Sequence, residues 1–324
     1  MTTHITYKPH YCDRRYGEYV ADNIYNMKLF GIPRSFPILS TAVVGKLNSF
    51  LIPEDSSYLC NGAFELYPVY YRKSKAKTIT MMKELTFWRL ETMSSYKREF
   101  IKRLFLTNKG IITDTRLMKR FIIKHIDLPV EIVNPFCAQP FLENKPNIRA
   151  KNIIFIGSFE SPTKGYGNLI EAFRLLRNDD KGWKLYMVGK RGTDFVSRNV
   201  PGMSVTNQVP SIKPYLAKCS IYVHPADFEP FGITVLEAMS AGVIPIVTCM
   251  TGSSEVLEDN KLSNLIIENN TPKIIENKIE EVYNYSTAKK RSISDKCKKI
   301  VKTNYLEKTG LEDFKKAFDR LLEN

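Results

Sequence analysis

Residues 151–260 alternate short apolar runs with segments of helical periodicity, and this alternation restricts the fold of the 324-residue chain more than any other feature. The apolar runs predict buried strands at residues 152–157, 184–189, 221–223 and 243–247, with a weaker strand at 203–209. The segments between them predict helices from about residue 167 and at residues 211–217 and 233–239. Strands and helices in this order are typical of a parallel, doubly wound α/β sheet, which binds its ligand at the carboxyl ends of the strands.

Two carboxylates, Glu229 and Glu237, flank Gly232 where a predicted strand leads into a predicted helix. The start of a helix presents unpaired backbone N–H groups and a partial positive charge, so the turn Gly232-Ile233-Thr234 can hold a diphosphate. Glu237 is placed one turn further along, where it can accept hydrogen bonds from ribose hydroxyls, and Glu229 can accept them from a sugar. Two glutamates eight residues apart also fit an exposed helix face and a loop charge, so the spacing alone leaves both interpretations open.

The residues around this pair, EPFGITVLEAMSAGVIPIVT followed by Gly252, resemble the donor-site signature of retaining glycosyltransferases of family 4, which have the GT-B fold. The resemblance implies an α/β chain with two Rossmann-like doubly wound domains that face a central cleft. It also implies that Glu229 contacts the transferred sugar, that Glu237 holds the ribose and that the backbone after Gly232 binds the phosphates. The donor would then be a nucleoside-diphosphate sugar.

The loop after the strand at residues 152–157 supports the same resemblance. In the family this loop reads Gly-Arg-Leu and then Lys-Gly, and both cations neutralise the donor diphosphate. Here Gly157 and the pair Lys164-Gly165 match, but Ser158 stands where the arginine is expected. Lys164 is therefore the one matched cation, although by itself it would be read as an exposed loop lysine.

Other parts of the expected donor site are less specific. Lys190 and Arg191 follow the predicted strand 184–189 and are candidates to replace the missing arginine. Members of the family clamp the nucleotide base near the loop that holds Gln208 and Val209, which is equally compatible with a surface turn. The full set of donor-binding residues that we predict is Gly157, Lys164, Gly165, Gln208, Val209, Glu229, Phe231, Gly232, Ile233, Thr234 and Glu237, with Lys164 and Glu229 catalytic.

The first half of the chain carries weaker signals. We expect the first strand at residues 4–8 and the first helix within the apolar-periodic residues 19–29, preceded by Gly17. A strand at residues 78–82 corresponds to the one after which many members of the family carry an active-site histidine, but Lys83 follows it here. We therefore assign no catalytic histidine.

The length suits two domains, each with its own core. We expect an acceptor-binding Rossmann-like domain at residues 1–142, a nucleotide-sugar-binding Rossmann-like domain at residues 143–305, and a C-terminal helix at residues 306–324 that packs back on the first domain. No apolar run is long enough to cross a membrane and the six cysteines are scattered, so we expect a cytoplasmic protein with reduced thiols. The sequence contains neither paired zinc-ligand spacing nor an Asp-x-Asp motif, so we expect no metal site.

The charge of the chain is distributed unevenly. Residues 1–150 hold 23 Lys and Arg against 13 Asp and Glu, a net charge of +10, whereas residues 151–324 hold 25 against 21, a net charge of +4. A basic acceptor domain favours an acceptor that is anionic or lies on an anionic surface. Residues 83–106 combine apolar side chains at helical spacing with lysines and arginines, which fits either a helix lying on a membrane or an ordinary helix facing the core.

The resemblance implies a retaining glycosyltransferase that moves a hexose-type sugar from a UDP- or GDP-sugar to an acceptor hydroxyl, with no metal or other cofactor required. A lipid-linked or membrane-surface glycan is favoured over DNA as the acceptor, and the enzyme would lie in the cytoplasm, peripheral on the inner membrane surface. Three alternatives stay open: a GT-B epimerase or phosphorylase with the same scaffold, a glucosyltransferase that modifies DNA, and a basic, non-catalytic GT-B protein that binds a nucleotide sugar or nucleic acid.

Overall fold

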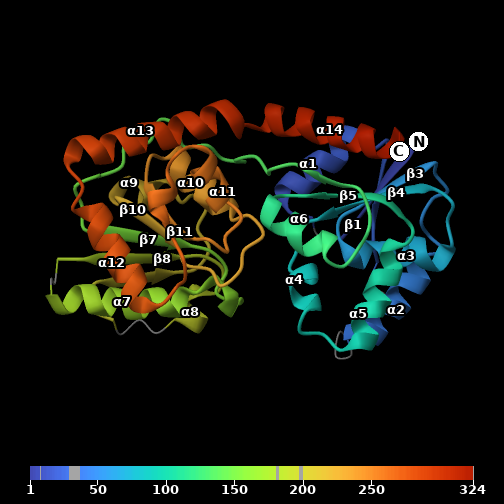
Figure 1. The fold of residues 1–324 in the computed structure, drawn as a ribbon, viewed down its shortest axis with the longest axis horizontal. Helices are drawn as coiled ribbons and strands as arrows, with labels where there is room; N and C mark the ends of the chain where they lie inside the picture. Colours follow the sequence, from blue (N-terminus) through green and yellow to red (C-terminus); the bar gives the residue numbers. More distant parts are fainter. Residues whose placement is uncertain (8, 29–36, 180–181, 197–199, 324) are drawn as a thin grey trace. The chain divides into compact units, whose positions relative to one another are not determined.

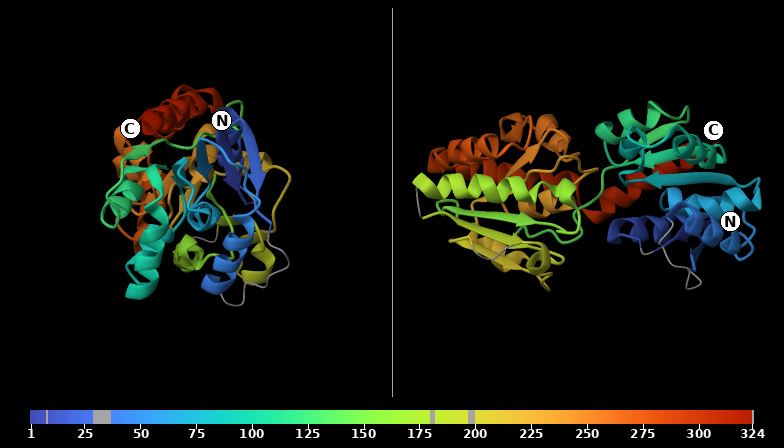
Figure 2. Two further views of the ribbon diagram at one scale, coloured as in Figure 1. Left: turned by 90° about the vertical axis from the view of Figure 1, so that its right-hand side faces the viewer. Right: turned by 90° about the horizontal axis from the view of Figure 1, so that it is seen from below.

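The computed structural model describes residues 1–7, 9–28, 37–179, 182–196 and 200–323. The chain forms two compact units: unit 1 comprises Met1–Pro135 and Glu307–Asn324, and unit 2 comprises Phe136–Leu306 (Figure 1). Each unit contains a parallel six-stranded sheet with flanking helices, which Figure 2 shows from two further directions. The α/β class expected from the sequence is therefore confirmed.

Unit 1 holds its strands in the order β2-β1-β3-β4-β5-β6, and neighbouring strands run parallel. Its strands are β1 (Thr2–Thr6), β2 (Asn23–Asn26), β3 (Ser57–Cys60), β4 (Lys77–Met82), β5 (Asn108–Thr113) and β6 (Val130–Ile132). Its helices are α1 (Tyr11–Val20), α2 (Pro37–Asn48), α3 (Ala63–Arg72), α4 (Thr86–Leu90), α5 (Ser95–Phe105), α6 (Arg116–Ile123) and α14 (Glu307–Glu323). The final helix packs on the first one, since Phe314 of α14 stacks on Tyr16 of α1 with ring centroids 4.3 Å apart.

Unit 2 holds its strands in the order β12-β11-β10-β7-β8-β9, again parallel throughout. Its strands are β7 (Asn152–Ile156), β8 (Lys184–Val188), β9 (Met203–Thr206), β10 (Ile221–His224), β11 (Ile244–Thr248) and β12 (Ile266–Ile267). Its helices are η1 (Pro162–Lys164), α7 (Tyr166–Asp179), α8 (Gly192–Phe195), α9 (Lys213–Lys218), α10 (Ile233–Ser240), α11 (Ser254–Asp259), η2 (Ser263–Leu265), α12 (Pro272–Tyr283) and α13 (Thr287–Asn304).

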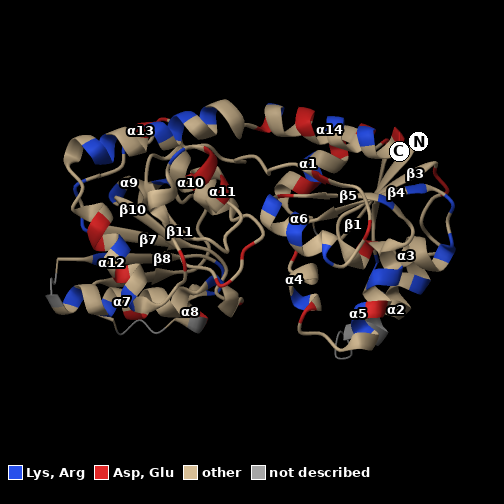
Figure 3. Ribbon diagram, viewed as in Figure 1, with Lys and Arg blue, Asp and Glu red and all other residues tan. Residues whose placement is uncertain are grey.

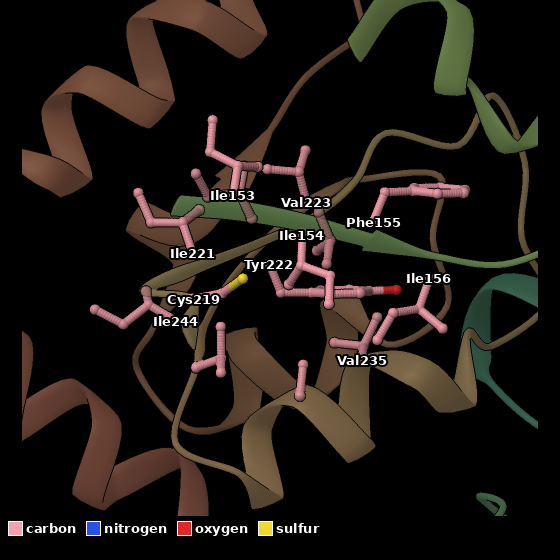
Figure 4. Close-up of a cluster of buried hydrophobic side chains, with 14 of the residues drawn as sticks. Ile153, Ile154, Phe155, Ile156, Cys219, Ile221, Tyr222, Val223, Val235 and Ile244 are labelled. Atoms are coloured by element: carbon pink, nitrogen blue, oxygen red, sulfur yellow. The ribbon is translucent and has the colours of Figure 1, made fainter. Parts of the chain in front are cut away.

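The core of unit 2 explains why its strands were readable from the sequence. Figure 4 shows consecutive side chains of β7, such as Ile154 and Phe155, gathered with Tyr222 of β10 and Val235 of α10, and all four residues are fully buried. A parallel sheet covered on both faces buries every side chain of its central strands, so these strands appear in the sequence as continuous apolar runs rather than alternating ones.

The expectation for the first helix is wrong. Helix α1 covers Tyr11–Val20 instead of residues 19–29, and strand β2 follows it; Leu29 lies outside the described residues. Gly17 lies inside this helix rather than before it. A Cβ at this position would lie 1.8 Å from Nδ1 of the buried His4, so only glycine fits. A close approach to a buried side chain thus places a glycine within a helix, against its low helix propensity.

The continuous helix considered for residues 83–106 is also wrong, because the segment divides into α4 and α5. Lys83 lies before α4, where its ammonium is 3.3 Å from Asp13 and 3.0 Å from Asp114. These two ion pairs fix Lys83 in the segment between β4 and α4, so Lys83 is not part of a helix. The first strand begins at Thr2, earlier than expected, and Lys8 lies outside the described residues. Within the described ranges, no helix is both long and apolar enough to cross a membrane.

Candidate functional site

Two of the predicted residues, far apart in the sequence, meet in unit 2. Lys164 ends η1, after β7, and Glu229 lies in the loop between β10 and α10. The ammonium of Lys164 contacts Glu229 Oε2, and the two side chains are only 23% and 13% exposed. Because β7 and β10 are neighbours in the sheet, the pair lies at the carboxyl ends of adjacent parallel strands, where α/β sheets bind ligands.

A chain of hydrogen bonds leads from Glu229 back to the start of α10. His224 Nε2 lies 3.4 Å from Glu229 Oε2, and His224 Nδ1 lies 2.9 Å from the Tyr222 hydroxyl. The Tyr222 hydroxyl in turn lies 2.7 Å from Thr234 Oγ1. Burial lowers the pKa of His224, so its imidazole is neutral at pH 7. A carboxylate only accepts hydrogen bonds, so we assign the proton to Nε2, and Nδ1 accepts from Tyr222.

The pKa values of the two predicted glutamates are shifted in opposite directions. Burial alone would raise the pKa of Glu229, but the hydrogen bond from His224 and the charge of Lys164 outweigh it and lower the pKa to about 2. Burial raises the pKa of Glu237, on α10, to about 7. Glu229 is therefore a permanent hydrogen-bond acceptor at neutral pH, whereas Glu237 is a carboxyl group whose ionised form lacks sufficient solvation.

The start of α10 presents backbone N–H groups beside a buried hydroxyl. Gly232 precedes the helix with φ +88°, a conformation that favours glycine, and Ile233 and Thr234 of the first turn are partly exposed. Ser253 lies beside this turn, since its backbone N–H donates to the Phe231 carbonyl at 2.8 Å. The buried hydroxyl of Ser253 has no hydrogen-bond partner among the residues that the structure describes. Backbone N–H groups with an adjacent hydroxyl suit a phosphate.

Close packing fixes the loop that carries Lys164. Gly165 has φ +67°, and a Cβ there would lie 1.8 Å from the carbonyl oxygen of Pro225 in the loop after β10. The backbone N–H of Asp227 also donates to the Thr163 carbonyl at 2.8 Å. The loops after β7 and β10 therefore touch through their backbones, which brings Lys164 within reach of Glu229.

Other predicted residues lie away from this cluster. Gln208 and Val209 follow β9, the edge strand, and β7 and β8 separate β9 from β10 in the sheet. Gly157 follows β7, and its N–H donates to the Val188 carbonyl at 3.0 Å. The side chain of Phe231 belongs to the core, so only its backbone reaches the site. Both cations considered as replacements for the missing arginine pair with the carboxylate of Glu160, at 2.7 Å for Lys190 and 3.6 Å for Arg191.

The sequence analysis missed His224, which it did not assign to any site. The available signal was its position at the end of a buried strand, five residues before Glu229. It also missed Asn270, whose side-chain amide donates to the Pro225 carbonyl at 2.9 Å and to Asp227 Oδ1 at 2.8 Å and so holds the loop after β10. No motif identified Asn270. Among the described side chains, no group of three or more His, Cys, Asp or Glu is arranged to hold a metal ion.

Comparison with known proteins relates unit 2 to one family. Residues 150–285 match the family model of the glycosyl transferases group 1. An uncharacterized glycosyltransferase of Methanocaldococcus jannaschii is 30% identical over 146 residues, which cover 42% of this chain and 39% of that protein. The GDP-Man:Man(3)GlcNAc(2)-PP-Dol alpha-1,2-mannosyltransferase of Yarrowia lipolytica is 22% identical over 209 residues, which cover 56% of this chain and 33% of that protein. The chain thus spans less than two fifths of the length of either relative.

A solved structure matches both units. Anabaena HepE in complex with UDP and glucose superposes with a TM-score of 0.74 at 14% sequence identity, covering 98% of this chain and 99% of that chain. The match shows that the chain has the GT-B fold.

Proposed function

We propose that this GT-B chain, whose residues 150–285 match the glycosyl transferases group 1, moves a hexose-type sugar from a nucleoside-diphosphate sugar to an acceptor hydroxyl, with retention at the anomeric carbon. The observation that carries the proposal is the contact of Lys164 with Glu229 beside the first turn of α10. This contact joins a cation for a leaving diphosphate and an ionised acceptor for sugar hydroxyls at one edge of one sheet.

In this proposal the leaving diphosphate is stabilised by three kinds of donor: the ammonium of Lys164, the backbone N–H groups of Ile233 and Thr234, and the hydroxyl of Ser253. An ammonium has three N–H donors, and Lys164 is 23% exposed, so it can contact Glu229 and a phosphate oxygen together. Glu229 positions the hydroxyls of the transferred sugar and is itself held by His224.

The remaining predicted residues bind the nucleoside. Glu237 accepts hydrogen bonds from the ribose, and these bonds offset the cost of keeping its carboxylate ionised. Gln208 and Val209, after the edge strand, contact the base. The Yarrowia relative takes GDP-mannose by name and the HepE structure contains UDP and glucose, so the donor in our proposal is a UDP- or GDP-sugar.

The transfer itself takes place on one face of the sugar. The bond between the anomeric carbon and the diphosphate oxygen breaks as the acceptor oxygen bonds to the same face, and the leaving phosphate receives the acceptor proton. No protein nucleophile and no metal take part. The positions of Lys164 and His224 support this role for Glu229, because both tie its carboxylate in place as a positioning group.

The acceptor in our proposal is a glycan on an anionic carrier, as on a lipid or a membrane surface. The support is the net charge of +10 on residues 1–150, and Figure 3 shows Lys and Arg residues along α3, α5 and α6 of unit 1. The name of the Yarrowia relative includes such a carrier, a dolichol diphosphate. We therefore place the protein in the cytoplasm, peripheral on the inner membrane surface.

The test is release of nucleoside diphosphate from a panel of UDP- and GDP-sugars, with water as the only acceptor. We expect slow hydrolysis of one donor, a loss of about 100-fold or more in Glu229→Ala, and no effect of EDTA. Glu171→Ala is the matched control, because that carboxylate lies on α7 and is 53% exposed. The anomer first seen by NMR should be that of the donor. If no donor is bound or hydrolysed, the transferase proposal fails.

A second candidate is a GT-B protein that binds a nucleotide sugar without turning it over. The observation that favours it is the absence of the family's arginine at Ser158, with Lys190 and Arg191 engaged by Glu160. One cation in place of two leaves less charge to stabilise the leaving group. Donor binding in calorimetry without release of nucleoside diphosphate, with or without an acceptor, would identify this candidate.

A further inference from the structure

Unit 1 contains a pocket of about 730 Å³ whose lining shares no residue with the Lys164–Glu229 site. Its floor is formed by residues that follow three neighbouring strands: Tyr7 after β1, Asn61 after β3, and Lys83 and Glu84 after β4. The carboxyl ends of neighbouring parallel strands are the usual place for a ligand in a doubly wound sheet. The walls come from Asp13, Thr41, Ala63, Phe64, Glu65, Tyr67, Thr86, Arg89, Met93, Ile101 and Leu104.

Two carboxyl groups of this pocket lie on either side of Gly62. A Cβ at Gly62 would lie 3.0 Å from Glu84 Oε1 and 3.3 Å from Glu65 Oε2. Glu84 is exposed and accepts from the Ala63 N–H at 3.1 Å, whereas Glu65 is only 5% exposed. Burial, and then the charge of Glu84, raise the pKa of Glu65 to about 8. At neutral pH one carboxyl group therefore donates a hydrogen bond and its neighbour accepts one.

A third polar group of the pocket lacks a partner. The side-chain oxygen of Asn61 is buried and accepts no hydrogen bond from any residue that the structure describes. A ligand that donates a hydrogen bond would satisfy it, since a buried acceptor without a partner destabilises the folded state. The pocket therefore offers both donors and acceptors to a ligand with hydroxyl groups.

The charges at the pocket disfavour an anion. Lys83 is held between Asp13 and Asp114 and lies 4.4 Å from the centre of the Tyr16 ring, so its charge is already compensated. Glu84 also lines the pocket and offsets the charge of Arg89, while Glu65 keeps its proton and adds no charge. The basic residues that give unit 1 its positive charge lie outside the lining, for example the exposed Lys73, Lys75, Lys97 and Arg103.

Aromatic rings complete the lining. Tyr7 and Phe64 pack edge to face, with ring centroids 5.8 Å apart, and Tyr67 lies on the same helix as Phe64. A sugar ring combines a C–H face, which packs on aromatic rings, with a rim of hydroxyls, which pair with carboxyl and amide groups. A phosphate group uses none of these features.

We propose that this pocket binds an uncharged sugar ring of the acceptor, with Glu65, Glu84 and Asn61 holding its hydroxyls. The identification of the ligand as an acceptor rests on the proposed function. The proposal also refines the acceptor expected from charge alone: the carrier faces the basic surface, while the part that enters the pocket is neutral.

The test is binding of methyl α-D-glucopyranoside, methyl α-D-mannopyranoside and methyl N-acetyl-α-D-glucosaminide to the full chain, each compared with the 6-phosphate of the same sugar by NMR titration. We expect at least one neutral glycoside to bind, its 6-phosphate to bind at least tenfold more weakly, and Glu84→Gln to lose about tenfold in affinity. Glutamine still accepts the Ala63 N–H, so the start of α3 is kept. Glu91→Gln is the control, since Glu91 pairs with Lys124 outside the pocket.

A pH series tests the donor role of Glu65. We expect wild-type affinity to fall as the pH rises through about 8 and the affinity of Glu65→Gln to stay constant, because glutamine keeps an N–H donor at every pH. The titratable or charged groups that face Glu65 are Tyr7, Asp13, Cys60, Tyr67, Lys83, Glu84 and Arg89.

Three results would overturn the inference: tighter binding of the sugar phosphates, unchanged affinity in Glu84→Gln, or equal pH profiles for wild type and Glu65→Gln. Binding of UDP and GDP is measured separately on the same samples. If the glycosides bind and neither UDP nor GDP does, the proposed function is wrong and the sugar pocket of unit 1 is still supported.

Discussion

Replacing Glu229 with glutamine should destabilise unit 2 in a way that depends on pH. The substitution keeps the shape of the side chain and removes the charge that Lys164 and His224 hold. The pKa of Glu229 falls from 4.5 to about 2 on folding, which corresponds to about 3 kcal/mol at about 1.4 kcal/mol per pH unit. Because the side chain is only 13% exposed, solvent screening leaves most of this contribution in place.

The lowered pKa of Glu229 determines how its contribution to stability changes with pH. A carboxyl group whose pKa is lower in the folded state stabilises that state when it is ionised, fully above its unfolded pKa of 4.5, and loses this contribution as the pH falls towards 2. The free energy of unfolding should therefore differ between wild type and Glu229→Gln by about 3 kcal/mol at pH 7 and by about 2 kcal/mol at pH 3.5.

The assay is urea unfolding followed by tryptophan fluorescence. The chain has two tryptophans, and Trp183 is buried in the core of unit 2, so a Trp88→Phe background makes Trp183 the reporter of this unit. Glu171→Gln serves as the matched control, since its carboxylate forms an exposed pair with Arg174 and should change stability by no more than about 0.5 kcal/mol. A difference below about 1 kcal/mol at pH 7, or one that is the same at both pH values, would refute the reasoning.

Further predictions concern Glu237 and two glycines. Because burial raises the pKa of Glu237 to about 7, ionisation of this side chain lowers the stability of unit 2 as the pH rises above 4.5. Glu237→Gln should therefore stabilise unit 2 by up to about 3 kcal/mol at pH 8 and weaken the binding of UDP or GDP. Equal stability of the variant and wild type at pH 8 would contradict this. Gly165→Ala should cost more than about 3 kcal/mol because its Cβ would meet the Pro225 carbonyl, whereas Gly232→Ala, with no neighbour nearer than 3.4 Å, should cost about 1–2 kcal/mol from its positive φ. Urea unfolding of both variants in the same fluorescence assay checks that Gly165→Ala is the more destabilising of the two. Equal losses of stability would contradict this prediction.

The sequence predicted the second half of the fold well, because burial there is uniform. Residues 153–156, for example, are apolar at every position, and Gly157 marks the end of the strand. The first half was harder to predict, since its elements depend on contacts between distant residues. Only glycine fits at position 17 of helix α1 because His4 leaves no room for a Cβ, and no local propensity contains that information.

The sequence by itself determined which residues stand at the ends of strands, and therefore which side chains are available to a ligand: Lys164 after β7, Glu229 after β10 and Glu84 after β4. Only the tertiary structure decided how they are paired and charged. Glu229 is held ionised by Lys164 and His224, while Glu65 keeps its proton beside Glu84. The reason is physical: a pKa depends on solvent exposure and on the charges within a few ångströms, and both come from residues that are brought together only when the sheet forms.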